Sequence, residues 1–226
     1  MFSFKGFQTQ DKNTHLEHLE DDIINRGAKG GENAINFLKS VRNMLAGSSG
    51  GVNMTVKWDG APAIICGINP ENGKFFVGTK SVFNKTPKIN YTTSDIRKNH
   101  DGEVAKKLQV CLANLSRLNI KGILQGDLLF TDDLKAINID GEKMISFTPN
   151  TITYAVPVNS DIGKRIARAK MGIVFHTSYS GKTMDKLSAS FGTVRGSGNR
   201  NVFLASAGYK ETAVMFSKSE LSSCLL

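Results

Sequence analysis

The sequence lacks an apolar run long enough to span a membrane, and it has few cysteines. The N-terminal stretch from Met1 to Thr14 is polar and has no apolar signal-peptide core. Cys66, Cys111 and Cys224 are the three cysteines, and they lie far apart without Cys-x-x-Cys spacing. This spacing argues against a disulfide framework and against a zinc site. We therefore expect a cytoplasmic protein that does not enter the membrane.

Size and charge narrow the class of protein further. The chain has 226 residues, of which 40% are hydrophobic and 22% charged, as is usual for a globular protein. Its 29 lysines and arginines exceed its 20 acids, and the net charge is +9. A basic balance favours polyanionic partners, nucleic acid first, although solubility alone is the simpler explanation because no dense basic run occurs.

The N-terminal part of the sequence predicts helices. The run from Thr14 to Glu17 is a capping box that opens a helix to about Asn25. Residues 32–45 place apolar side chains on one face and predict a second, amphipathic helix. Because a glycine- and serine-rich run follows at 47–51, we expect a helical segment over 1–46.

The remainder, 52–226, predicts a separate core whose boundary after 180 the pattern leaves undefined. Strands dominate it, two helices interrupt them, and the fold class expected is α+β with mostly antiparallel sheets. Asp140-Gly141 is a strong hairpin signal within 136–147. The other expected strands are 53–58, 61–68, 75–81, 120–130, 151–156 and 171–179, and the expected helices are 101–118 and 161–170, the second capped by Ser160.

One short segment carries the clearest chemistry: Val56-Lys57-Trp58-Asp59-Gly60. A lysine amine becomes a nucleophile only when uncharged, so its pKa must fall from about 10.4 toward about 7–8. Asp59 so close to Lys57 would favour the charged amine. We therefore expect the Asp59 carboxylate to face a metal, water or a ribose. Trp58 would point away from Lys57 and is expected to pack.

Further along, four strand-like segments each end in or contain a residue suited to binding a nucleotide. Lys80 offers a cation for phosphates, and Asp127 is an acid within an apolar strand. Tyr154 offers an aromatic ring for a base, and His176 ends the last strand. An ordinary structural role stays open for three of them: a solvated strand lysine for Lys80, a capping or salt-bridging acid for Asp127, and a core aromatic for Tyr154. Lys57 could likewise be an ordinary strand lysine at a turn.

The order of these segments resembles the covalent nucleotidyltransferase superfamily, which contains the ATP-dependent DNA and RNA ligases and the capping enzymes. Lys57-Trp58-Asp59-Gly60 is similar to motif I, whose lysine takes the AMP, and Thr79-Lys80 to the Ser-Arg pair that follows it. Gly126-Asp127-Leu128 is similar to motif III, whose acid binds the ribose or supports the metal site.

Two more segments extend the resemblance over roughly residues 52–179. Tyr154 is placed like the motif IIIa aromatic that stacks on adenine, and 172–175 is similar to the core of motif IV. The resemblance implies a ligase-type (ATP-grasp-like) core without an OB domain. It also implies ATP with Mg²⁺ or Mn²⁺ as cofactors, and a lysyl-AMP intermediate that is transferred to a 5′-phosphate end of DNA or RNA. Asp59, Gly60, Lys80, Asp127, Tyr154 and His176 would bind the nucleotide, and Asp127 the metal.

The chain also departs from this pattern. Pro62 replaces a common arginine, Met171 stands in place of the motif IV glutamate, and His176 in place of its final lysine. No Lys-x-Lys motif V follows. These departures keep two alternatives open: a degenerate, non-catalytic protein that binds nucleic acid or an assembly partner, and a nucleotide-binding regulatory module.

Two further segments bear on partners. The Lys-Trp-Asp-Gly-Ala-Pro run resembles uncharacterised proteins of large tailed phages, which would place the chain in the host-cell cytoplasm. Residues 192–201 include Arg195 and Arg200 in a glycine-rich run. This run is either a phosphate-contacting loop or an ordinary surface loop.

Overall fold

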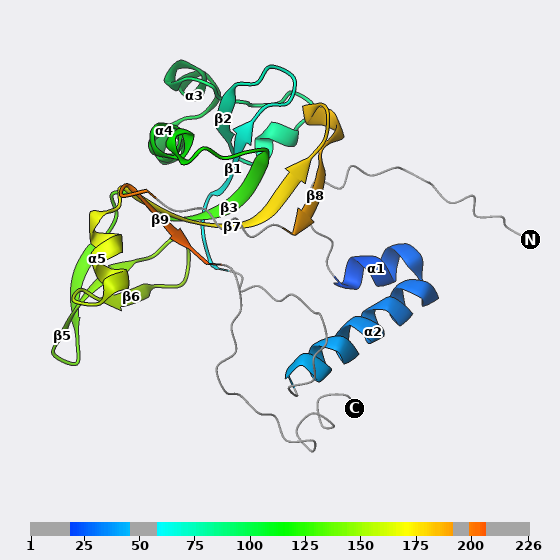
Figure 1. The fold of residues 1–226 in the computed structure, drawn as a ribbon, viewed down its shortest axis with the longest axis horizontal. Helices are drawn as coiled ribbons and strands as arrows, with labels where there is room; N and C mark the ends of the chain where they lie inside the picture. Colours follow the sequence, from blue (N-terminus) through cyan, green and yellow to red (C-terminus); the bar gives the residue numbers. More distant parts are fainter. Residues whose placement is uncertain (1–18, 46–57, 192–198, 207–226) are drawn as a thin grey trace, which may run out of the picture. The chain divides into compact units, whose positions relative to one another are not determined.

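A computed structural model describes residues 19–45, 58–191 and 199–206 (Figure 1). The described residues form two compact units, a helical one over 19–45 and a larger one over the remainder. Over these ranges the chain has five α-helices and two β-sheets, which confirms the α+β class. Thr14 to Glu17, the run 47–51 and most of the strand expected at 53–58 lie outside the described residues.

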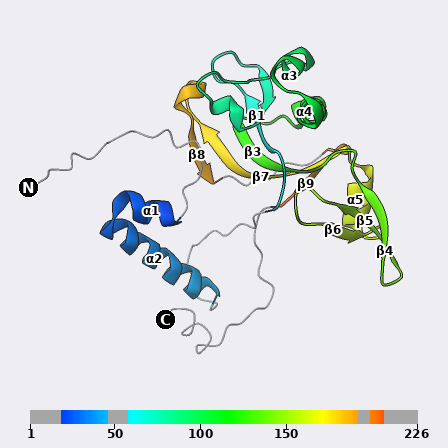
Figure 2. The same cartoon turned by 180° about the vertical axis from the view of Figure 1, so that it is seen from behind.

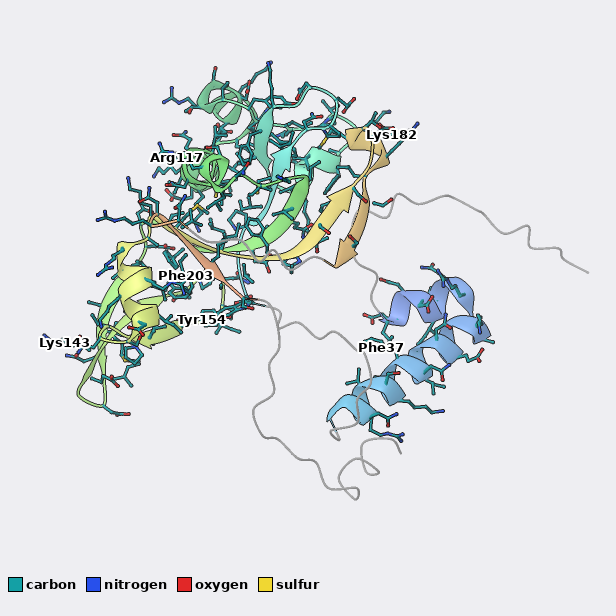
Figure 3. All side chains as sticks on the ribbon, viewed as in Figure 1. Phe37, Arg117, Lys143, Tyr154, Lys182 and Phe203 are labelled. Atoms are coloured by element: carbon teal, nitrogen blue, oxygen red, sulfur yellow. The ribbon has the colours of Figure 1, made fainter. Side chains whose placement is uncertain are left out.

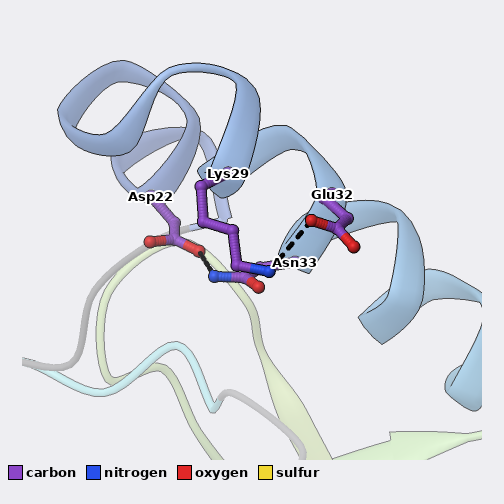
Figure 4. Close-up of polar contacts among 4 residues, drawn as sticks. All are labelled: Asp22, Lys29, Glu32 and Asn33. Atoms are coloured by element: carbon purple, nitrogen blue, oxygen red, sulfur yellow. Dashed lines mark hydrogen bonds and ion pairs between the residues drawn. The ribbon is translucent and has the colours of Figure 1, made fainter.

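The helical unit is a hairpin of α1 (Leu19–Arg26) and α2 (Ala28–Leu45). Gly27, at φ +55°, joins the two helices in the left-handed conformation that glycine adopts without strain. At Gly30 a Cβ would overlap the carbonyl of Asp22, so the helices approach closely there. The Asn33 amide donates to the Asp22 carboxylate at 3.2 Å, while Lys29 pairs with Glu32 within α2 (Figure 4).

The larger unit is built on a six-stranded sheet in the order β2-β1-β3-β7-β8, with β9 pairing β7 in parallel (Figures 1 and 2). All other pairings in this sheet are antiparallel. The strands are β1 (Ala63–Ile68), β2 (Phe75–Gly78), β3 (Ile123–Phe130), β7 (Met171–Ser180), β8 (Ser188–Phe191) and β9 (Val202–Ala205).

A second sheet has the order β4-β5-β6 and is entirely antiparallel. Its strands are β4 (Lys135–Ile139), β5 (Glu142–Phe147) and β6 (Tyr154–Pro157). Asp140 and Gly141 both have positive φ, 49° and 82°, as a two-residue hairpin turn of type I′ requires. The hairpin prediction is confirmed. Helix α5 (Asp161–Arg168) follows, and the Ser160 hydroxyl accepts the N–H of Gly163 at its start, as predicted.

Helix α4 (Gly102–Leu115) covers one face of the six-stranded sheet. Leu108 and Leu115 are fully buried there against Leu128 and Ile173. Val104 is 38% exposed, because Ala105 occupies the inward position one residue later. Cys66 and Cys111 lie in the same core, where burial raises the pKa of both thiols, that of Cys111 to about 12. Both thiols are therefore chemically inert.

The opposite face of this sheet is covered at its two ends. One apolar cluster gathers around Ile123 and Tyr179, and a second around Leu129 and Val174 joins the sheet to β5 and α5. Side chains alternate along a strand, so Gln125 and Asp127 of β3 face the region between these two clusters.

Helix α3 (Thr93–Asn99) was not predicted. A capping box opens it, since Thr92 and Asp95 bond each other's backbone amides, and the bond from the Thr92 hydroxyl lowers the Asp95 pKa.

The strand expected over 75–81 ends at Gly78 because Thr79 caps a 3₁₀ helix, η1 (Lys80–Phe83). The other short 3₁₀ helices are η2 (Ser116–Leu118) and η3 (Met184–Lys186). No helix among the described residues is long and apolar enough to cross a bilayer.

Candidate functional site

The segment that follows Lys57 lies along strand β3. Lys57 itself is outside the described residues, and the structure takes up the chain at Trp58. The Ala61 N–H donates to the Leu128 carbonyl at 3.1 Å, and the Leu128 N–H donates to Pro62 at 3.2 Å. A Cβ on Gly60 would overlap that of Asp127, so only glycine fits there without a shift of the backbone. The structure thus brings Gly60 and Asp127, separated by more than sixty positions in the sequence, into contact.

Asp127 and His176 face each other across strands β3 and β7. The Asp127 Oδ1 atom lies 3.5 Å from His176 Nε2, and the two side chains are 13% and 26% exposed. The register of the two strands shifts here, since Gln125 pairs with Thr177 but Gly126 with Phe175. His176 is therefore the extra residue of a β-bulge, which turns its ring toward the acid.

Three neighbours complete a polar strip, made up of Gln125, Asp127, His176, Thr177 and the Tyr179 hydroxyl. Thr177 Oγ1 lies 2.8 Å from His176 Nδ1 and fixes the ring orientation. The Tyr179 hydroxyl donates to Gln125 at 2.5 Å, and burial raises the Tyr179 pKa to about 12. Tyr179 is therefore neutral at physiological pH and acts as a hydrogen-bond donor in this strip.

Asp59 fastens the segment after Lys57 to the loop before β6. Its carboxylate accepts the N–H groups of Thr151 and Ile152 at 2.6 and 2.8 Å. It also accepts the side-chain amide of Asn150 at 3.0 Å. These bonds give Asp59 a positioning role that the sequence did not indicate. Nucleotide binding by Asp59 stays a prediction, and these contacts do not require it.

Trp58 and Tyr154 belong to an aromatic cluster beside the second sheet. Their ring centroids are 5.1 Å apart, and Tyr154 also stacks on Phe147 at 5.4 Å. The Tyr154 hydroxyl accepts the Asp59 N–H at 3.3 Å, and the Trp58 indole donates to the carbonyl of Ser206 at 3.2 Å. In Figure 3, Tyr154 and Phe203 lie close together in this part of the unit. Trp58 packs as expected.

Lys80 and Met171 are two other positions that the sequence singled out. Lys80 begins η1 just beyond β2, is exposed, and makes no ion pair with any described residue. Gly78 pairs with Ile65 and Asp127 with Ala63, so Lys80 lies at the same end of the sheet as Asp127. Met171 is fully buried in the core under α4. An acid at that position would face apolar side chains and could not reach Asp127.

The residues that could hold a metal are few. Within the described ranges no three His, Cys, Asp or Glu side chains gather in one place. Asp127 and His176 offer one oxygen and one nitrogen, so any cation would need phosphate oxygens and water as its remaining ligands. The aspartate oxygen suits a nucleotide-bound Mg²⁺, the histidine nitrogen suits a softer cation, and the pair does not make a closed metal site.

Sequence reasoning missed several residues that shape this region. Four residues act through contacts distant in sequence or through the bulge at His176: Asn150, Gln125, Thr177 and Tyr179. Only Gln125 carried a signal, because a polar side chain between apolar neighbours on a strand needs a partner.

The fold and the site define an α+β protein in which Gly60 lies against Asp127, and Asp127 faces His176 on a mostly antiparallel sheet. Residues 13–225 match the model of a family of unknown function, DUF6267, and the chain belongs to that family. No curated protein and no solved structure gives a significant match to it.

Proposed function

We propose that the protein is a ligase-like nucleotidyltransferase that forms a covalent lysyl-AMP on Lys57. One observation carries the proposal: Gly60, three residues after Lys57, rests against Asp127, which itself faces His176. Segments similar to motifs I, III and IV of the superfamily are thereby gathered at one place on the sheet. The apolar packing of β3 and β7 does not by itself explain why an acid stands at 127 and a histidine at 176.

In the proposed reaction the uncharged Lys57 amine attacks the α-phosphorus of ATP. A nitrogen–phosphorus bond forms, the bond to the bridging oxygen breaks, pyrophosphate leaves, and the amine gives up a proton. An oxygen of a 5′-phosphate end of DNA or RNA then attacks the phosphorus of the AMP. The nitrogen–phosphorus bond breaks, and the lysine amine takes up a proton and is regenerated.

The described residues have distinct parts in this scheme. Asp59 holds the segment after Lys57 on the loop at 150–152, and Lys80 supplies a charge for phosphates. Asp127 would offer a carboxylate oxygen to Mg²⁺ or Mn²⁺, which would neutralise the departing pyrophosphate. His176, whose Nε2 lies 3.5 Å from Asp127 Oδ1, would orient that carboxylate beside the nucleotide. Tyr154 is half-buried and in contact with Trp58 and Phe147, and in this scheme its ring would also contact the adenine.

The test is self-nucleotidylation with α-labelled ATP or GTP and Mg²⁺ or Mn²⁺, followed on a denaturing gel. We expect a labelled band that Lys57→Ala abolishes and that the control Lys74→Ala, at an exposed lysine, retains. A label that survives Lys57→Ala contradicts the assignment of the nucleophile. Absence of label from a folded sample with either nucleotide and either metal contradicts the activity.

A second candidate is a non-catalytic member of the same fold that binds nucleic acid or an assembly partner. Two observations favour it: the Asp59 carboxylate already accepts three hydrogen bonds, and Met171 lies in the core where the resembled family has an acid. Salt-sensitive nucleic-acid binding without any thermal shift on adding ATP would select this candidate.

A further inference from the structure

Five exposed basic side chains gather where α5 ends and β9 begins. We call this group the basic patch, and its members are Lys164, Arg165, Arg168, Lys170 and Arg200. Two backbone bonds join its halves, since the N–H groups of Lys170 and Met171 both donate to the carbonyl of Asn201, next to Arg200. Figure 1 shows the start of β9 beside α5.

Among the described residues, only Lys164 of the basic patch pairs with an acid. The one ion pair there joins Lys164 to Asp161 at 4.0 Å, and the Asp161 side chain is fully exposed. Helix α4 differs, because its Lys106 pairs with Glu103 at 2.6 Å. The four other cations of the patch repel one another, and a bound polyanion would relieve that repulsion.

One member of the patch is held in place by packing. The Arg165 guanidinium lies 5.3 Å from the centroid of the Phe203 ring, which belongs to the aromatic cluster beside the second sheet. A stacked guanidinium keeps its N–H donors free at its edge, and the fork geometry of these donors suits phosphate oxygens.

The patch also lies within reach of the candidate site. Lys170 precedes β7, and four residues later Val174 pairs with Asp127. At about 3.3 Å per strand residue, the patch is about 13 Å along β7 from Asp127. A strand whose phosphates rest on the patch can therefore extend toward the polar strip.

We infer that the basic patch is the docking surface for the sugar-phosphate backbone of a nucleic acid. This deepens the proposed function, since it locates the nucleic acid whose 5′ end would receive AMP. Binding itself needs neither ATP nor a metal nor Lys57, so it can be tested separately. The contacts are to phosphates, and the surface therefore reads no base sequence.

The test is fluorescence anisotropy of a labelled single-stranded oligonucleotide at several salt concentrations, in Lys57→Ala protein without nucleotide or metal. The patch variant carries Arg168→Glu, Lys170→Glu and Arg200→Glu. The control variant makes the same charge change at three exposed cations elsewhere, Arg97→Glu, Arg117→Glu and Lys121→Glu. Figure 3 shows Arg117 beside α4, away from α5.

We expect the patch variant to bind at least about tenfold more weakly, and its log–log salt slope to shrink by about 2 to 3, because three phosphate contacts are lost. The control variant should change little. A neutral variant with glutamine at the same three patch positions should lose affinity too, and a circular dichroism melt checks that each variant is folded. Equal losses in patch and control variants, no binding by the parent, or tighter binding to phosphatidylserine vesicles than to the oligonucleotide would each overturn the inference.

Discussion

The two faces of the six-stranded sheet differ in what their side chains do. The face under α4 is continuously apolar and buried, with Leu108, Leu128 and Ile173 in one cluster. The opposite face is apolar only at its ends, and between them Asp127 and His176 remain partly exposed. Strand β3 contributes to both, because alternate residues face opposite ways. One strand thus supports the core with Leu124 and Leu128 and the candidate site with Gln125 and Asp127.

The largest effect is expected on the covered face. Leu108→Ala removes a fully buried side chain, so the free energy of unfolding should fall by about 2–5 kcal/mol. Val104→Ala on the exposed side of the same helix should cost less than about 1 kcal/mol. Denaturant titration measures both. If labelling of the folded Leu108→Ala protein also disappears, the separation of the two faces fails.

A smaller effect is expected where the segment after Lys57 crosses β3. In Gly60→Ala the new methyl group overlaps the Asp127 Cβ and lies 2.9 Å from the Leu128 carbonyl oxygen. Overpacking of this kind should cost about 1–3 kcal/mol and reduce labelling. Gly31→Ala is the control, because nothing lies within 4 Å of its added methyl group and alanine favours helix. A Gly60→Ala protein as stable as its parent would show that Gly60 does not lie in close contact with Asp127 and Leu128.

The next smaller effect on stability is expected from loss of the hydrogen bonds that the Asp59 carboxylate accepts. Asp59→Ala leaves the amides of Thr151 and Ile152 without their acceptor, and since that loop is exposed, water replaces part of the loss. We expect about 1–2 kcal/mol from thermal unfolding and slower labelling. Asp59→Asn keeps one acceptor oxygen and should lose less. Equal stability of parent and alanine variant would remove the anchoring role.

The smallest stability effect is expected at His176, where function should respond most. His176→Gln changes a partly exposed pair, so the unfolding free energy should move by less than about 1 kcal/mol. Labelling should nonetheless fall at least about tenfold. Ser180→Ala, exposed at the end of the same strand, is the control for both readouts. Unchanged labelling in His176→Gln would remove the histidine from the site.

Local pattern was enough to predict the hairpin at Asp140-Gly141, helix α4 and strand β7. Each has a strong periodic or turn signal that tertiary contacts do not override. Helix α3 was missed because its apolar content is small and its stability begins with the Thr92–Asp95 cap. Strands β8 and β9 were missed because serine and glycine surround them, and their pairing with β7 supplies the order that their sequence does not.

The candidate site also contains one residue that the sequence indicates and contacts that it does not. Asp127 could be singled out because an acid within an apolar strand is costly unless it has a partner. That partner could not be predicted, since a bulge in β7 aims His176 at it. The role of Asp59 depends on a loop more than ninety residues away in sequence, which no local spacing reveals.

Trp58 is the sole tryptophan in the chain, and it directly follows the proposed nucleophile. Its indole contacts Tyr154 and donates to Ser206, so the fluorescence of the whole protein reports on one defined environment. Emission intensity and quenching by acrylamide therefore give a label-free optical signal. Titrating nucleotide, metal or oligonucleotide against this signal would follow each ligand at the candidate site in real time.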